Sequence, residues 1–215
     1  MSGRLVLFSL GALLASALLV SPSAVISSAS ATTLAPLSTE QMVDASDAIV
    51  RGTVVDVWAV IERGHINTHT RIAVSRVLKG RAVSAVEVVT PGGVLDSTLT
   101  EVQGAPRYGV GEDVLVLLAA RADGTYLNVS LGAGKYTVKQ NPADGSSMVV
   151  QFFVPFARDW DHRFIPSPAL ADRVSLTAME ARITDRVAAG WDGKPISGVS
   201  NDHLRAINNL QGGVR

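Results

Sequence analysis

Cysteine is absent from this 215-residue sequence, so no disulfide holds the fold together and no thiolate can act as a nucleophile or metal ligand. Attachment of a lipid through cysteine is excluded for the same reason. Lys and Arg together number 19, as do Asp and Glu, and aromatic residues make up only 5% of the chain. Because nucleic-acid-binding proteins need a basic surface, and single-strand binders also need exposed aromatics, this composition argues against nucleic acid as a partner.

Several motifs of catalysis and phosphate binding are also missing. The sequence has no G-x-S-x-G stretch of a serine hydrolase and no calcium-binding loop with Gly at its sixth and Glu at its twelfth position. The stretch Gly132-Ala133-Gly134-Lys135 contains G-x-G-K but lacks the spacing and the following Ser or Thr of a phosphate-binding loop. We interpret it as a β-turn or bulge, and the sequence predicts no cofactor.

The first residues, 1–31, have the pattern of a secretory signal peptide. A positive charge at Arg4 precedes an apolar run over residues 5–20, and Ala29-Ser30-Ala31 fits the A-x-A pattern of a cleavage site. The apolar run is shorter than the roughly 20 residues of a membrane span. The sequence therefore predicts a mature, monomeric chain that starts at Thr32, is secreted or periplasmic, and has no membrane contact after cleavage.

The middle of the chain, residues 32–155, predicts a β-barrel domain with a short leading helix. Ser38 and Gln41 have the spacing of a capping box, which starts that helix. Valine-rich stretches separated by turn residues predict about six to seven strands between residues 48 and 154. Gly52 indicates a bulge in the first strand, and residues 63–67 are the expected first turn. The apolar run over residues 113–120 predicts a strand buried on both faces.

The C-terminal part has a different character. Residues 156–190 predict a loop followed by an amphipathic helix that packs on the barrel, with Leu176, Met179, Ile183 and Val187 on one stripe. Residues 191–215 are rich in Gly, Asn and Ser, so we expect a loosely ordered tail. The fold class expected from these segments is mainly β, a small barrel with a helix at each end.

Three stretches of the sequence carry a resemblance to a known family. They are Ser46 to Val54, Arg71 to Gly80 and Gly111 to Leu118. Their order resembles the netrin-like module, the OB-like barrel of tissue inhibitors of metalloproteinases and of many exported bacterial proteins. The resemblance covers about residues 46–120 and implies an OB-like barrel in which Lys79-Gly80 forms a corner. Those inhibitors use disulfides and an N-terminal cysteine that chelates zinc, so their mechanism does not carry over to this chain.

Two groups of polar residues are candidate metal ligands. Asp159, Asp161 and His162 form the densest cluster, with carboxylates and an imidazole that suit a divalent cation or acid–base chemistry. His65 and His69 are four residues apart, a spacing that places both on one face of a regular strand, but the expected turn lies between them. The alternatives are a packed loop around Trp160 and ordinary polar residues in a hairpin.

Residues 91–110 form the longest irregular stretch among the expected strands, and long loops on a rigid scaffold often carry function. Leu95, Leu99 and Tyr108 in this loop, with Lys79 at the corner, are the candidate ligand contacts; a lid packed over the barrel is the alternative. The sequence thus predicts an exported, non-catalytic module that binds a protein or saccharide partner in the cell envelope. The alternative is a metal-dependent hydrolase that uses the Asp/His cluster, which would require three of those side chains in one pocket.

Overall fold

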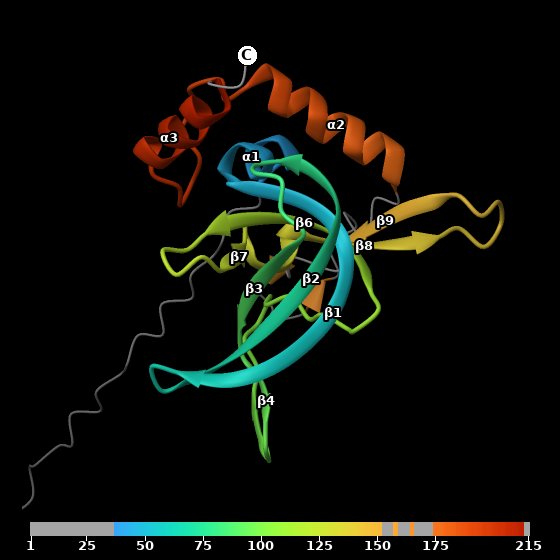
Figure 1. Cartoon of the computed structure of the whole chain (residues 1–215), viewed down its shortest axis with the longest axis vertical. Helices are drawn as coiled ribbons and strands as arrows, with labels where there is room; N and C mark the ends of the chain where they lie inside the picture. Colours follow the sequence, from blue (N-terminus) through green and yellow to red (C-terminus); the bar gives the residue numbers. More distant parts are fainter. Residues whose placement is uncertain (1–36, 152–156, 159–163, 166–173, 213–215) are drawn as a thin grey trace, which may run out of the picture. The chain divides into compact units, whose positions relative to one another are not determined.

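The computed structural model of the protein describes residues 37–151, 157–158, 164–165 and 174–212 (Figure 1). The signal peptide expected at 1–31 lies outside the described residues. The helices are α1 (Thr39–Ala45), α2 (Leu176–Ala189) and α3 (Asn201–Gly212), with a 3-10 turn at Leu131–Gly134. The strands are β1 (Ala48–Glu62), β2 (His65–Lys79), β3 (Ala85–Pro91), β4 (Gly93–Leu95), β5 (Thr98–Thr100), β6 (Asp113–Ala120), β7 (Tyr126–Asn128), β8 (Lys135–Gln140), β9 (Ser147–Gln151), β10 (Ala157–Arg158), β11 (Phe164–Ile165) and β12 (Val174–Ser175).

The chain is mainly β, as the sequence predicts. One sheet of eight strands has the order β1-β2-β3-β7-β6-β8-β9-β12, and β1 also pairs with β6. The pairings β1-β2-β3-β7-β6 therefore return to β1, while β8, β9 and β12 continue the sheet beyond β6. The count of six to seven strands expected between residues 48 and 154 was too low, because the described residues hold nine strands there and twelve in all. Several of the additional strands are only two or three residues long, too short to show an alternating pattern in the sequence.

The two longest strands, β1 and β2, form a curved hairpin (Figure 1). Their pairing shifts register at three places, one of them between Arg51 and Gly52, so the bulge expected at Gly52 is confirmed. A Cβ atom at Gly52 would lie 2.2 Å from the carbonyl oxygen of Ala73. Only glycine lets the two backbones come this close, and the bulge helps β1 to bend from β6 toward the tip of the hairpin.

The first turn is shorter than expected. It contains only Arg63 and Gly64, with φ values of 52° and 82°, and β2 begins at His65. Two successive residues with positive φ form the tight hairpin turn whose twist matches that of the flanking strands. The polar residues from 65 to 67 therefore continue the strand, although their composition is typical of a turn.

Strand β6 separates two clusters of buried side chains. Leu115 and Leu117 belong to a cluster beneath the helices, whereas Val114, Val116 and Leu118 belong to a cluster enclosed by β1, β2 and β3. All five are fully buried. The expectation of a strand buried on both faces is confirmed, and this strand joins the two halves of the core.

The helices lie together at one end of the described unit (Figure 1), and α1 contacts both α2 and α3. The capping box of α1 is confirmed, because the Ser38 hydroxyl accepts from the Gln41 N–H and the Gln41 side chain accepts from the Ser38 N–H. On α2, Leu176, Met179 and Ile183 are buried as predicted, and Val187, the last residue of the expected stripe, is half-buried. None of the helices described here is both long and apolar enough to span a bilayer.

The structure places a helix, α3, in the segment for which the sequence predicts a loosely ordered tail. Leu204 and Ile207 on α3 are 1% and 5% exposed, and Ile196 just before it is 4% exposed. Leu204 and Ile207 are three residues apart and so share a face of α3, but the many polar residues and glycines around them hide this face in the average composition. Burial of this face against α1 and the nearby core supplies the order that local propensity does not.

We expect Gly52→Ala to lower the free energy of unfolding by about 1–3 kcal/mol, because the new methyl group must displace the backbone of Ala73. Urea unfolding followed by tryptophan fluorescence measures this change. Gly109→Ala is the matched control, since a Cβ at Gly109 meets no atom within 4 Å. Equal stability of the two variants would contradict a close approach of β1 and β2 at Gly52.

Candidate functional site

The predicted metal ligands do not form one cluster in the part of the chain that the structure describes. Asp159, Asp161 and His162 lie outside the described residues. His65 and His69 both lie on β2, so the expectation of a turn between them was wrong, because the hairpin turn ends at Gly64. His65 is exposed, whereas His69 is 7% exposed. Across the described ranges, no three His, Asp or Glu side chains are placed to hold a metal ion.

His69 instead lies between two carboxylates on the outer face of β1, β2 and β3. Its Nδ1 is 2.7 Å from Oε1 of Glu87, and its Nε2 is 3.2 Å from Oε1 of Glu62. The indole of Trp58 stacks on the imidazole, with ring centroids 5.4 Å apart. The Arg71 guanidinium lies 5.3 Å from the Trp58 ring centroid, a cation–π contact. We call these residues, together with Asn67, the polar row.

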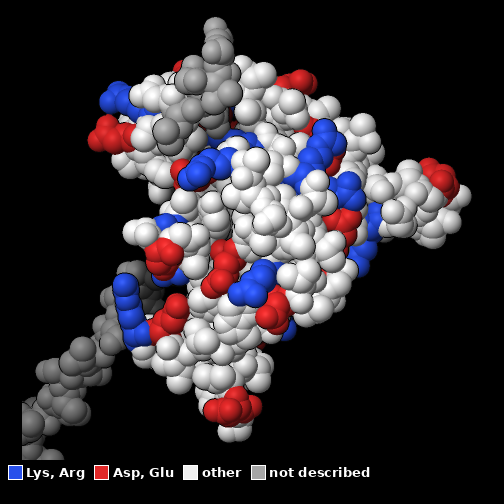
Figure 2. All heavy atoms as spheres, in the orientation of Figure 1, with Lys and Arg blue, Asp and Glu red and all other residues white. Residues whose placement is uncertain are grey.

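The polar row is held by its own hydrogen bonds. Asn67 Nδ2 donates to Oε2 of Glu62 at 2.8 Å. This hydrogen bond, with the neighbouring His69, holds the pKa of Glu62 below its usual value. The two carboxylates contact different nitrogens of His69, so they do not converge on one point as metal ligands would. On the face shown in Figure 2, basic and acidic side chains are interspersed without a large patch of one sign.

The loop 91–110 combines an exposed hairpin with a packed segment. Leu95 on β4 is half-buried, and Leu99 on β5 is 64% exposed. Tyr108 packs against the core cluster enclosed by β1, β2 and β3, and its hydroxyl donates to Oδ1 of Asn128 at 2.9 Å. Burial raises the pKa of Tyr108 well above its usual range. The Nζ of Lys135 lies 4.6 Å from the Tyr108 ring centroid.

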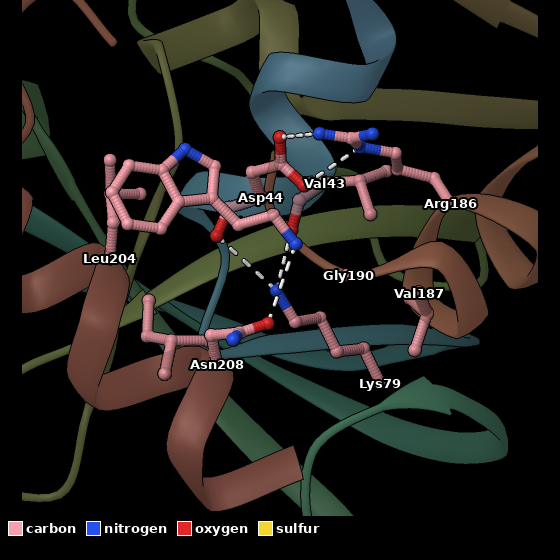
Figure 3. Close-up of a pocket in the computed structure, with 10 residues that line it drawn as sticks. Val43, Asp44, Lys79, Arg186, Val187, Gly190, Leu204 and Asn208 are labelled. Atoms are coloured by element: carbon pink, nitrogen blue, oxygen red, sulfur yellow. Dashed lines mark hydrogen bonds and ion pairs between the residues drawn. The ribbon is translucent and has the colours of Figure 1, made fainter. Parts of the chain in front are cut away.

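Lys79 joins β2 to the end of α1 (Figure 3). Its side chain is buried, and Nζ donates to the carbonyl oxygens of Val43 at 2.6 Å and Asp44 at 3.3 Å. These carbonyls belong to the last turn of α1, where few intrahelical donors remain, and the Val43 carbonyl also accepts the N–H of Ser46 at 3.3 Å. Arg186 of α2 binds the Asp44 carboxylate through two hydrogen bonds, of 2.9 and 2.5 Å. Desolvation by burial lowers the pKa of Lys79 to about 8.

A groove of about 340 Å³ lies where β3 and β7 separate. These parallel strands pair at one position, Val88 with Tyr126, and the residues that follow on both strands line the groove. Its polar lining consists of Asn67, Thr90, Arg121 and Asn128, and its apolar lining includes Val89, Pro91, Pro106 and Leu127. Because Asn67 also belongs to the polar row, the groove and the row are continuous. We call this feature the β3–β7 groove.

Asn128 is a buried polar side chain of the β3–β7 groove. It is 8% exposed, and its Oδ1 accepts the hydroxyl of Tyr108. Its Nδ2 is buried and has no hydrogen-bond partner among the described residues. A buried donor without an acceptor costs about 1–3 kcal/mol, and Nδ2 has less than 1 Å² of exposed surface, so this amide nitrogen lies behind the groove wall.

Arg121 contributes the only charged side chain among the residues that line the β3–β7 groove. Its Nη1 donates to Oγ1 of Thr125 at 3.2 Å, and its Nη2 lies 3.3 Å from Oδ2 of Asp123. These contacts fix the guanidinium in the hairpin between β6 and β7. The Asp123 carboxylate also balances the charge of Arg121, so the guanidinium offers hydrogen-bond donors to the groove without giving it a strong positive potential.

Reasoning from the sequence missed the β3–β7 groove and identified only its neighbour Tyr108. One local signal was present, since Asn128 is a polar residue with low strand propensity between the apolar Leu127 and Val129. The groove itself depends on the pairing of β3 with β7, which no local pattern reveals. Comparison of the sequence with protein-family models gives no match, and comparison with curated proteins gives none either.

The buried amine of Lys79 gives a prediction about pH. The unfolded chain keeps a proton on this group up to about pH 10, whereas the folded protein releases it near pH 8. Between these values the unfolded state binds more protons, so folding stability rises with pH. Between pH 8 and pH 10, we expect the unfolding free energy of the wild type to rise by about 2 kcal/mol more than that of the Lys79→Met variant.

Urea unfolding of both proteins at several pH values measures this difference. The Lys79→Met variant controls for every other titrating group, because only the side chain at position 79 differs. Parallel stability curves for the two proteins between pH 8 and pH 10 would show that the folded state does not perturb the amine.

Proposed function

We propose that the mature protein is an exported, non-catalytic binding module, secreted or periplasmic, built on a small OB-like barrel. The closed order of pairings, β1-β2-β3-β7-β6, supports this description, as does the parallel pairing of β3 with β7. The resemblance to the netrin-like module comes from the strands β1, β2 and β6, which belong to this ring. The fold by itself does not name a ligand, which has to come from the site.

The ligand that fits the β3–β7 groove best is a sugar unit of a saccharide. The observation that carries this proposal is a groove, formed where two strands separate, whose lining combines the polar Asn67, Thr90 and Arg121 with apolar walls. Beyond Val88 and Tyr126 the facing edges of β3 and β7 no longer pair with each other, so backbone donors and acceptors border the groove together with the amides. Such a mixture, between walls of proline, valine and leucine, suits hydroxyl groups on an apolar ring. The volume lies in the range of about 300–1,000 Å³ that is typical of small-ligand sites.

No observation favours the alternative of a metal-dependent hydrolase over binding. That mechanism relies on Asp159, Asp161 and His162, outside the described residues, acting with His65 or His69. Both ring nitrogens of His69 already contact carboxylates. The polar row is therefore assigned to shaping the surface beside the β3–β7 groove rather than to catalysis.

The experiment that tests this function is a glycan array of neutral and acidic oligosaccharides probed with the mature chain, followed by calorimetry of the best oligosaccharide. We expect Asn128→Asp to weaken binding about tenfold, which corresponds to about 1.4 kcal/mol. The substitution keeps an oxygen for the hydroxyl of Tyr108 but replaces the amide donor by an acceptor. A thermal melt checks that the variant remains folded.

Leu99→Ser is the matched control, because Leu99 is exposed on β5 and does not line the β3–β7 groove. It should bind the oligosaccharide as the wild type does. Absence of binding to every arrayed glycan, or equal binding by Asn128→Asp and the wild type, would overturn the assignment of the groove to a saccharide.

A further inference from the structure

Among the described residues, one edge of β1 has no partner strand over about half of its length. β1 pairs with β2 almost throughout, but its pairing with β6 covers only Ala48 to Thr53. From Asp56 to Glu62 it pairs only with β2 among the described residues. Natural sheets protect such edges with Lys, Pro or bulges; this stretch contains neither Lys nor Pro, and its register shift lies at its start, between Val54 and Asp56.

The tight turn at Arg63 and Gly64 determines which backbone groups face this edge. In a two-residue hairpin the residues that flank the turn, here Glu62 and His65, form a hydrogen-bonded pair. Since such pairs alternate along an antiparallel ladder, Val57, Ala59 and Ile61 direct their N–H and C=O groups away from β2. The edge thus presents a row of donors and acceptors at the spacing of a β-strand.

Apolar side chains lie at the distal end of the edge. Ile61 is 65% exposed, and it lines a second groove of about 320 Å³ together with Ile66 and Leu95. The β4–β5 hairpin forms the other wall of this groove, and Val94 on β4 is 63% exposed. A strand added along β1 would therefore end beside a groove that can receive an apolar side chain.

Charge distinguishes a foreign strand from a second copy of this chain. Asp56 and Glu62 lie on the same face of β1, at the two ends of the open stretch. Antiparallel self-pairing over the whole stretch, with the faces matched, would place Asp56 directly opposite Glu62 of the second copy, twice. Like charges directly opposite each other destabilise a sheet. An added strand with Lys or Arg opposite Asp56 and Glu62 would instead be stabilised by opposite charges.

From these observations we infer that the open edge of β1, from Asp56 to Glu62, binds an extended segment of another protein as an added antiparallel strand. The segment carries basic residues opposite Asp56 and Glu62 and apolar residues between them. Backbone hydrogen bonds provide its affinity, and the charges and the groove at Ile61 provide its selectivity. This surface uses main-chain groups of β1 and does not depend on the β3–β7 groove.

The test uses the mature chain and the synthetic peptide Thr-Lys-Val-Thr-Val-Thr-Val-Lys-Thr, whose lysines have the spacing of Asp56 and Glu62. Binding is measured by fluorescence anisotropy of the labelled peptide, and amide exchange is followed by NMR. We expect saturable binding, with exchange at Val57, Ala59 and Ile61 slowed at least tenfold. Failure to bind at millimolar peptide, or protection of other amides instead, would overturn the proposal.

Two substitutions make the test specific. Ala59→Pro removes an outward N–H and should abolish binding, whereas Ala59→Val keeps the N–H and should not. Asp56→Lys should weaken binding of the lysine peptide and strengthen binding of the same peptide with both lysines replaced by glutamate, a reversal that misfolding cannot produce. Equal affinity of Asp56→Lys for the two peptides would contradict the proposed register. Formation of dimers by the mature chain through this edge, seen by sedimentation, would assign it to a second copy and overturn the proposal.

Discussion

The burial of β6 on both of its faces is the constraint on which the rest of this structure depends. Because the chain has no cysteine, no disulfide joins the helical end to the strand ring, and the packing of buried side chains holds the two together. Leu115 and Leu117 pack under α1 and α2, while Val114 and Val116 pack inside the ring on the other face of the same strand. Because a strand alternates its side chains between two faces, one run of apolar residues binds both halves of the core. Polar residues in this run would uncouple the helices from the sheet.

Buried polar contacts then determine how the helices sit on this core. Lys79 satisfies the last carbonyls of α1, and Arg186 binds Asp44 in the same turn, so β2 and α2 both hold the end of α1. The charge of Lys79 is retained in a buried site, at a cost that shows in its lowered pKa. For the buried pair of Asp44 and Arg186 we expect a larger contribution to the choice of one helix arrangement than to net stability, because a helix docked differently would leave its charges unpaired.

The features predicted from the sequence are those that a few neighbouring residues encode. The capping box at Ser38, the bulge at Gly52 and the buried strand over residues 113–120 each depend on contacts or periodicity within a short window. The end of the first turn was misplaced because the left-handed conformation of Arg63 closes the hairpin before the polar residues that follow. The contact of Tyr108 with Asn128 and the groove beside it depend on the register of β3 with β7, which is set by strands far apart in the sequence. Reasoning from the sequence therefore identified these local features and one residue next to the β3–β7 groove.

Both candidate binding surfaces have the same structural origin, which is the unequal length of neighbouring strands. β1 and β2 contain 15 residues each, whereas β6 contains 8 and β7 only 3. The closed ring of strands β1-β2-β3-β7-β6 therefore extends only as far along β1 and β2 as the short strands β6 and β7 reach. Where β6 leaves β1, the backbone of β1 faces outward, and where β7 leaves β3, the two strands open into a groove. In each place, hydrogen-bonding groups that a longer neighbour would occupy are available to a ligand, and the rigid ring below holds them in position.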